Sequence, residues 1–244
     1  MRKIKRHLAA AALIALPAIA AAATAPGAFS AIVADGSRPP EDTARDADRK
    51  PANVMAFAGV RKGAKIAELA PGGGYFTRLL SLAVGPAGHV YAVSGRPAPA
   101  VDAWAVDHPQ VTMSLIKAGD ALAPVPVDIV WTTLNYHDFK NVKVGDTDAA
   151  ALYNAAAFKA LKPGGVYLIS DHAAAAGAGT TVTSTLHRIE EASVIKEVEA
   201  AGFKLDARSK LLNHAGDDHT QKVFESGVRG KTDQFLLRFV KPKR

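Results

Sequence analysis

Cysteine is absent from the 244 residues of this sequence. Disulfide bonds and thiolate metal sites are therefore excluded. A leader of the lipoprotein kind is excluded as well, because lipid attachment to such a leader needs a cysteine.

Clusters of basic side chains are also scarce, although the formal net charge is +7. Four of the 30 basic residues lie within the first six positions, and the remaining 26 nearly balance the 23 acidic residues. The nearest approach to a basic cluster is the short tail at 241–244. Because binding to a phosphate backbone needs clustered basic residues, we expect no nucleic-acid partner.

Histidine spacings that bind metal ions, such as HxxxH and HExxH, are missing too. Imidazole and carboxylate groups do occur at His137, Asp138, Asp171 and His172, and such groups suit zinc. A metal-dependent hydrolase is therefore an alternative, but without a ligand motif we predict no metal site.

The first 23 residues combine a basic start, an apolar stretch rich in alanine, and small residues at its end. This pattern is typical of a cleaved signal peptide, and the stretch is short for a membrane span. We predict a signal peptide over 1–23, a linker over 24–37 and one domain over 38–244. The mature protein would be periplasmic or secreted, with no stable membrane anchor.

Apolar patterns along the domain predict strands that alternate with helices. We expect helices at 51–60, 76–84, 149–161 and 186–201, and strands at 65–69, 90–93, 111–115, 127–131, 166–170, 204–209 and 234–240. Such alternation implies the α/β class with a doubly wound, mostly parallel sheet, here of seven strands. In such sheets ligands bind beyond the carboxyl ends of the strands.

The segment 65–77 reads KIAELAPGGGYFT. A buried strand here ends near an acidic residue, Glu68, runs into a glycine turn and opens a helix. Glycine lets a backbone approach a ligand closely, and the free amides of the helix start offer hydrogen bonds. The sequence therefore predicts a nucleotide-type pocket at this turn.

The spacing of this turn differs from the dinucleotide pattern GxGxxG. It is similar instead to the first motif of class I S-adenosylmethionine-dependent methyltransferases, an acid followed by GxGxG, with Ala70 in place of the first glycine. The resemblance extends over about 38–242 and is closest to exported methyltransferase-like proteins. It implies a Rossmann-like methyltransferase fold and S-adenosylmethionine as cofactor. The cofactor-binding residues that it implies are Glu68, Ala70, Pro71, Gly72, Gly74, Tyr75, Ser94, Asp120 and Asn135.

Ser94 stands at the end of the second strand, where most family members place an acid that binds the ribose hydroxyls. Asp120 lies where the family has an acid that contacts the adenine amino group, although capping of a turn is the other common role of a loop aspartate. The charged segment at 37–51 is either a solvated helix with local ion pairs or, as the resemblance implies, the helix before the first strand that often lies over the cofactor in this family. That helix would bring Arg45, Asp46 or Arg49 near the pocket.

Polar side chains follow the fourth strand, at 135–138. Loops at this edge of a sheet carry function disproportionately, and the family keeps substrate-facing residues here. We expect Tyr136, His137 and Asp138 to be catalytic, with His137 as a base because the imidazole pKa lies near neutrality.

The predicted function is transfer of a methyl group from S-adenosylmethionine to an unidentified small-molecule or protein acceptor. The alternative is a non-catalytic periplasmic ligand-binding protein on the same fold, because the cofactor is made in the cytosol and a fold does not fix a function. The metal-dependent hydrolase is the weaker alternative.

Overall fold

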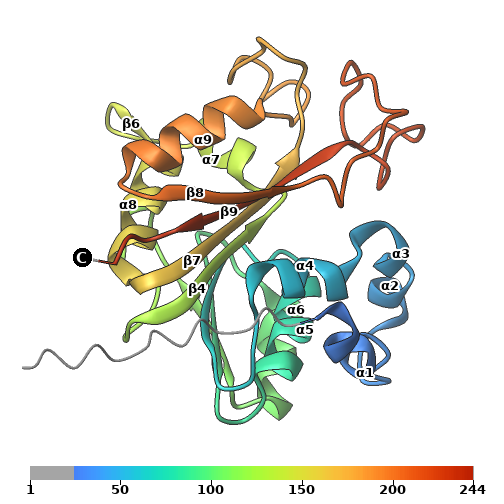
Figure 1. The fold of residues 1–244 in the computed structure, drawn as a ribbon, viewed down its shortest axis with the longest axis vertical. Coiled ribbons are helices and arrows are strands. Elements are labelled where there is room, and N and C mark those ends of the chain that lie inside the picture. Colours follow the sequence, from blue (N-terminus) through green and yellow to red (C-terminus); the bar gives the residue numbers. More distant parts are fainter. Residues whose placement is uncertain (1–24, 244) are drawn as a thin grey trace, which may run out of the picture.

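The computed structural model describes residues 25–243, whose elements are labelled in Figure 1. The predicted signal peptide over 1–23 lies outside the described residues. A sheet of seven strands in the order β3-β2-β1-β4-β7-β9-β8 forms the centre of the fold. Its strands are β1 (Lys65–Leu69), β2 (His89–Ser94), β3 (Val111–Leu115), β4 (Val127–Thr133), β7 (Leu161–His172), β8 (Lys204–Ser209) and β9 (Gln234–Val240), and a separate hairpin joins β5 (Lys143–Val144) to β6 (Thr147–Asp148).

The pairing of the strands sets the position of the ligand edge. β1 pairs in parallel with β2 and β4, β2 with β3, and β4 with β7. β9 is antiparallel to both of its neighbours, β7 and β8. The strand order reverses between β1 and β4, where ligands bind in open parallel sheets. The predicted doubly wound, mostly parallel seven-stranded sheet is confirmed.

Helices cover both faces of the sheet. They are η1 (Pro26–Phe29), α1 (Ser30–Val33), α2 (Pro40–Thr43), α3 (Asp46–Arg49), α4 (Pro51–Ala58), α5 (Tyr75–Val84), α6 (Pro99–Asp107), α7 (Tyr136–Asn141), α8 (Ala149–Ala160) and α9 (Glu191–Ala200). In Figure 1, α4, α5 and α6 lie on one side of the sheet, and α7, α8 and α9 on the other. Within 25–243, no helix is long and apolar enough to cross a bilayer.

β1 shows how the sheet is buried on both faces. Side chains alternate between the two faces of a strand. Ile66 therefore joins the apolar cluster that contains Leu79 of α5, whereas Ala67 joins the cluster on the opposite face with Tyr153 of α8. Since every residue of β1 after Lys65 is buried, this strand brings its acidic residue into the interior, next to the turn.

The predicted linker over 24–37 is corrected by η1 and α1, which occupy part of that range. Phe29 is only 3 % exposed and packs in the same apolar cluster as Val54 and Met55 of α4. Burying a phenylalanine side chain stabilises a fold by roughly 1.5–3 kcal/mol. The packed body therefore begins before residue 38.

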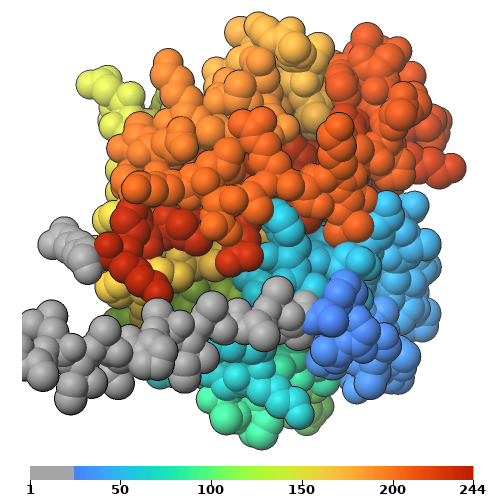
Figure 2. Space-filling model, in the orientation of Figure 1, coloured from blue at the N-terminus to red at the C-terminus, as the bar shows by residue number. Residues whose placement is uncertain are grey.

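Ion pairs and hydrogen bonds fasten the charged segment at 38–50 to the start of α5. Arg38 and Asp46 form an ion pair of 2.7 Å, and the Tyr75 hydroxyl donates to Asp46 at 2.6 Å. Arg78 of α5 binds Asp42 at 2.6 Å, and both of these side chains are buried. Figure 2 shows this segment, in blue, at one side of the molecule beside the cyan residues of α4. These contacts fix where α3 and its side chains lie.

Three further helices differ from the sequence-based expectation. α9 begins at Glu191 rather than near 186, because His187 has a left-handed backbone (φ +55°) that no helix contains. α7 lies within a segment predicted to be a loop, and α6 lies where no element is predicted. Both are short, at six and nine residues, which makes their apolar periodicity difficult to recognise.

Candidate functional site

The turn after β1 depends on unusual backbone conformations. Ala70, Gly72 and Gly74 have φ values of +53°, +57° and +82°. A Cβ atom at Gly72 would meet nothing within 4 Å, whereas one at Gly74 would lie 2.8 Å from Nη1 of Arg78. Gly74 is thus needed for close packing at the start of α5. Gly72 leaves its side of the turn open to a ligand.

Glu68 places a buried carboxyl group beside this turn. The residue is 3 % exposed, and its Oε2 accepts a hydrogen bond of 2.6 Å from Oγ1 of Thr77. Burial raises the pKa of Glu68 to about 7, against the hydrogen bond from Thr77 and the charges of Arg49 and Arg78, which lower it. A ligand that brings a positive charge or a hydrogen-bond donor would stabilise the ionised form.

A cavity of about 210 Å³ opens between this turn and the end of β4. It is lined by six of the residues predicted to bind the cofactor: Glu68, Ala70, Pro71, Gly72, Tyr75 and Asn135. Asn135 is held in place because its Nδ2 donates to the carbonyl oxygens of Ala70 (3.0 Å) and Thr133 (2.7 Å). The side chain therefore links the ends of the two strands at which the strand order reverses.

Arg49, at the end of α3, brings a positive charge to the wall of the small cavity. Its guanidinium lies 4.1 Å from the ring centroid of Tyr75 and 5.0 Å from that of Phe76. Within residues 25–243 this guanidinium forms neither an ion pair nor a hydrogen bond. Burial lowers the pKa of Arg49 to about 10, so it stays cationic at neutral pH. It is an unpaired cation facing a cavity, which suits an anionic ligand group.

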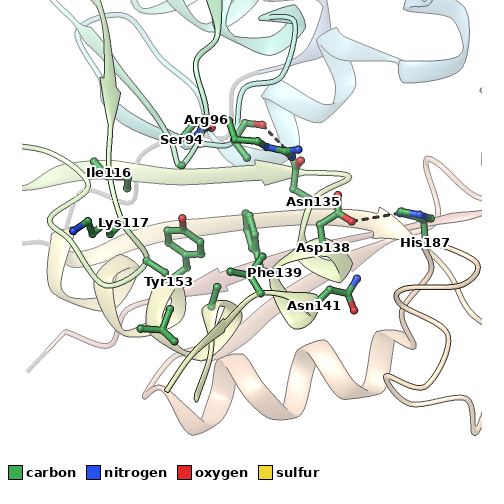
Figure 3. A pocket seen from close by; sticks show the side chains of 16 residues that line it. Ser94, Arg96, Ile116, Lys117, Asn135, Asp138, Phe139, Asn141, Tyr153 and His187 are labelled. Carbon is green, nitrogen blue, oxygen red and sulfur yellow. Dashed lines mark hydrogen bonds and ion pairs between the residues drawn. The ribbon is translucent and has the colours of Figure 1, made fainter. Parts of the chain in front are cut away.

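A larger cavity, of about 670 Å³, lies on the other side of Ala70 and Asn135, which line both spaces. This volume falls in the range of roughly 300–1,000 Å³ that small-molecule sites occupy. Figure 3 shows Tyr153 and Phe139 side by side in this cavity, with Ser94 and Ile116 on its opposite wall. The wall is mostly apolar, with polar groups at its edges.

Ser94 and Asp120 lie in different places relative to the larger cavity. Ser94 lines it, and its Oγ accepts a hydrogen bond of 3.1 Å from the backbone of Arg96. Asp120 lines neither of the two cavities, because its Oδ2 accepts a hydrogen bond of 2.7 Å from the backbone of Lys117. This hydrogen bond gives Asp120 the role of capping a turn, and its contact with adenine stays a prediction.

Tyr136 also differs from its prediction. The residue is fully buried, and its hydroxyl donates to Glu197 at 2.9 Å and accepts from Asn154 at 2.8 Å. Because α7 starts at this position, the ring points into the core below α8 and α9 rather than into a cavity. The expectation that Tyr136 faces a substrate is corrected, and its contacts are those of a structural residue.

Asp138 lines the larger cavity together with His187, and the buried His137 lies next to Asp138. Nδ1 of His137 lies 2.8 Å from Oδ1 of the buried Asp171, whose Oδ2 accepts from the His137 backbone at 2.7 Å. Burial lowers the pKa of His137, but the charges of Asp171 and Asp138 outweigh it, and the pKa is raised. Oδ1 of Asp138 lies 3.4 Å from Nε2 of His137 and 3.4 Å from Nδ1 of His187. Figure 3 shows Asp138 and His187 facing each other.

His187 is the residue of this site that sequence reasoning missed. It was expected to begin a solvated helix, but it lies in the loop before α9 and lines the larger cavity. No local motif marks it, because its neighbours in the site come from a distant part of the chain. Its left-handed backbone (φ +55°) is a feature that only the structure reveals.

Comparisons with known proteins add the following. No protein-family model matches the sequence, and no curated protein matches it. A solved S-adenosylmethionine-dependent methyltransferase from Aquifex aeolicus is similar in fold, with a TM-score of 0.58 and 17 % identity over 88 % of this chain and 98 % of that chain.

Two further solved structures are similar to this chain. A fibrillarin from Aeropyrum pernix, in complex with natively bound S-adenosyl-L-methionine, has a TM-score of 0.52 and 18 % identity over 80 % of this chain and 76 % of that chain. An arsenic(III) S-adenosylmethionine methyltransferase from Chlamydomonas reinhardtii has a TM-score of 0.55 and 17 % identity over 88 % of this chain and 73 % of that chain. At these identities the likeness shows the fold, and it confirms the predicted Rossmann-like methyltransferase fold.

Proposed function

We propose that this protein binds S-adenosylmethionine and transfers its methyl group to a small-molecule or protein acceptor. The observation that carries the proposal is the junction of two cavities at Ala70 and Asn135. It lies where the buried acid, the glycine turn and the start of α5 meet the end of β4. Two of the solved structures with the same fold, from Aquifex aeolicus and Chlamydomonas reinhardtii, are methyltransferases by name, which supports the proposal.

The residues of the small cavity suit the amino-acid end of the cofactor. Glu68 would accept hydrogen bonds from its ammonium group, and the unpaired guanidinium of Arg49 would bind its carboxylate. Gly72 would let the backbone approach it, since no side chain occupies that side of the turn. The charges of Glu68 and Arg49 are therefore complementary to the ammonium and carboxylate groups of the amino-acid end.

The larger cavity suits an adenosine, with an apolar wall for the base and polar atoms for the ribose. Phe139 and Tyr153 would contact the base, and Ser94 would offer a hydroxyl near the ribose. The sulfonium of the cofactor supplies an electrophilic methyl group, and alignment with the acceptor is the main contribution that a protein makes to the transfer. Asn135, at the junction of the cavities, would hold the two halves in register.

The acceptor would bind beside Asp138 and His137. Nε2 of His137 can take a proton from an acceptor hydroxyl or amine when no metal ion occupies this nitrogen. Asp171 orients the ring for this role through Nδ1. Asp138 is 41 % exposed in its side chain and lines the cavity, so it can contact the acceptor directly. Export to the periplasm or beyond, as the leader pattern suggests, is part of the same proposal.

A ligand-binding protein without catalysis is the second candidate, and Ser94 is the observation that favours it. The position that holds a ribose-binding acid in most of the resembled family carries only a hydroxyl here, and that hydroxyl already accepts a backbone hydrogen bond. In this case the cofactor would bind, but no transfer would follow. Binding must therefore be measured apart from turnover.

Calorimetric titration of the purified protein with S-adenosylmethionine and S-adenosylhomocysteine tests the proposal. We expect heat of binding with both ligands and its loss in Gly72→Leu, whose side chain would project into the small cavity. Gly59→Leu is the matched control, because Gly59 also has a positive φ (+76°) and free space around its Cβ position, but lines neither cavity. It should bind as the unchanged protein does.

Absence of heat with both ligands at millimolar concentration would refute cofactor binding. Equal affinity in the two leucine variants would show that the cofactor does not enter the small cavity. Binding that never yields S-adenosylhomocysteine, with acceptors that range from catechols and thiols to amines, would favour the non-catalytic candidate.

A further inference from the structure

The cluster at the rim of the larger cavity contains more than a base and an acid. His137, Asp138 and His187 each offer one ligand atom, and these three atoms all lie within 4.8 Å of one another. Two of these residues come from α7, and the third comes from the loop between β7 and α9. Imidazole and carboxylate are the ligands that zinc and similar divalent ions prefer.

Distances within the cluster match ligands that share one ion. The separation of 3.4 Å from Oδ1 of Asp138 to each imidazole nitrogen is long for a hydrogen bond between such groups. Two ligands at about 2.1 Å from the same ion in tetrahedral geometry lie roughly 3.4 Å apart. The carboxylate oxygen thus stands at ligand-to-ligand distance from both rings.

His137 is oriented as a ligand. Its Nδ1 hydrogen bonds to Asp171, which is 0 % exposed and is fixed in turn by backbone amides of His137 and His172. A carboxylate that accepts from Nδ1 leaves the lone pair of Nε2 free, and this arrangement recurs behind metal-binding histidines. Asp171 and His172, which the sequence suggested as possible ligands, lie behind the site. The ring of His172 binds Thr232 at 2.7 Å instead.

His187 supplies a donor atom that has no hydrogen-bond partner. Its Nδ1 is buried and unsatisfied, and a buried polar atom in that state is costly unless something binds it. The backbone at His187 is left-handed (φ +55°), a conformation that is uncommon for residues other than glycine. Arg188, fully buried and paired with Asp217, holds the loop in this shape.

We propose that His137, Asp138 and His187 bind a divalent transition-metal ion of the zinc type. Asp138 and His187 line the larger cavity, so the remaining coordination positions would face it. One carboxylate and two neutral imidazoles leave the bound ion with a net positive charge, which would let it act as a Lewis acid. A consequence that rests on the proposed function is that acceptors with a hydroxyl or thiol group would be activated by coordination.

No ligand motif announces this site in the sequence, from which no metal was expected. His137 and Asp138 are adjacent, a spacing that is common in loops, and the third ligand lies beyond β5, β6, α8 and β7 in the chain. Only the fold brings it to the other two.

Metal titration of the purified protein, after treatment with a chelator and without any cofactor, tests the inference. We expect one Zn²⁺ ion to bind per chain in calorimetry, and Co²⁺ to produce the visible absorption of a site with nitrogen and oxygen ligands. His187→Ala and Asp138→Asn should each weaken Zn²⁺ binding at least about tenfold, and Asp171→Asn by roughly 10–100-fold through the orientation of His137. Thermal unfolding would verify that each variant is folded.

His214→Ala is the matched control, because the ring of His214 forms no hydrogen bond within the described residues and the residue lies outside the cluster. It should bind Zn²⁺ as the unchanged protein does. No binding of Zn²⁺ or Co²⁺ at millimolar concentration, or unchanged affinity in folded His187→Ala and Asp138→Asn, would overturn the inference. Because these titrations contain no S-adenosylmethionine, their outcome is independent of whether the cofactor binds.

Discussion

Burial of the Glu68 carboxyl links the stability of the protein to pH. Its pKa is about 7 in the folded protein and 4.5 for the free group. Between these values the folded protein holds a proton that the unfolded chain has released, so the free energy of unfolding falls as pH rises through this window. Above about pH 7 the full cost of the buried charge is present.

Glu68→Gln removes this titration. We expect the variant to be more stable than the unchanged protein at pH 8, by about 1–3 kcal/mol, and nearly equal to it at pH 4. Urea unfolding at the two pH values measures the difference. The exposed Glu41→Gln is the control and should have no effect at either pH. Lower stability of Glu68→Gln at pH 8 would contradict the assigned pKa.

Arg49 is expected to matter for ligand binding and little for stability, because it has no ion-pair or hydrogen-bond partner among residues 25–243. Arg49→Gln should lower the affinity for S-adenosylmethionine by roughly 10–150-fold, the equivalent of one hydrogen bond to a charged group. The affinity for 5′-methylthioadenosine, which lacks the amino-acid end, should not change. Calorimetry with both ligands measures this split.

Arg61→Gln is the control for that experiment, since Arg61 is an exposed arginine in an ion pair with Asp128 and lines neither cofactor cavity. An equal loss of affinity for both ligands in Arg49→Gln would contradict this role. It would mean that the guanidinium maintains the shape of the site and does not bind the carboxylate of the ligand.

The residues of the site differ in how far sequence could predict them. A local pattern is enough to predict residues at or just after the end of a strand, because the carboxyl ends of parallel strands share one edge of the sheet. Such residues are Glu68, Gly72 and Asn135. Tyr136 was predicted on the same argument, but one helical turn directs its ring into the core. His187 could not be predicted, because its place depends on a loop whose shape is fixed by contacts with a distant segment.

At the scale of elements, two long loops are held together by one buried ion pair. We call residues 173–190 the β7 loop and residues 210–233 the β8 loop. Arg188 of the β7 loop binds Asp217 of the β8 loop with two contacts, of 2.7 and 2.9 Å, and both side chains are fully buried. The guanidinium also donates to the carbonyl oxygens of Ala173 and Gln221. The backbone amide of Ala173 also donates to the carbonyl oxygen of Asp233 (2.9 Å), and that of Val223 to the carbonyl oxygen of Leu186 (3.3 Å). The ion pair therefore adds a buried charged link to the backbone hydrogen bonds between the two loops.

Removing one member of this pair should be costly, because the other charge stays buried. We expect Arg188→Met to lower the free energy of unfolding by about 3–5 kcal/mol. The double variant Arg188→Met/Asp217→Asn should lose less than the sum of the single variants. Chemical denaturation of the four proteins of this cycle provides the measurement.

The partly exposed pair of Arg238 and Asp206, at 3.2 Å and with side chains 33 % and 39 % exposed, is the control. Arg238→Met should cost about 1 kcal/mol or less. Strict additivity of the Arg188 and Asp217 variants would show that the two side chains do not interact across the loops.

Elements were predicted well where strong apolar runs end in glycine, proline or polar residues. The predicted ranges of β3, β8 and β9 agree with the structure, because each is a run of alternating or continuous apolar residues between polar loops. α7 and α9 were predicted less well. The start of α9 is set by the tertiary contacts of the β7 loop, and α7 is too short to show a period.

At the scale of the whole molecule, sequence predicted the architecture because strand and helix alternation restricts the topology strongly. The same alternation says nothing about which side chains cover the ligand edge. In this protein they come from segments far apart in the sequence, among them the N-terminal segment with Arg49, the turn after β1, the loop after β4 and the β7 loop. A fold prediction therefore fixes the place of the site and leaves its chemistry to the segments around it.

The buried pair of Arg188 and Asp217 also bears on how such a protein can diverge. A recombination event that replaced only one of the two loops would leave a buried charge without its partner and impair folding. Descendants that acquire a new acceptor are therefore expected to inherit both loops together, as one exchangeable module on an unchanged sheet. Anyone who builds chimeras from this scaffold should transfer 173–190 and 210–233 as a unit.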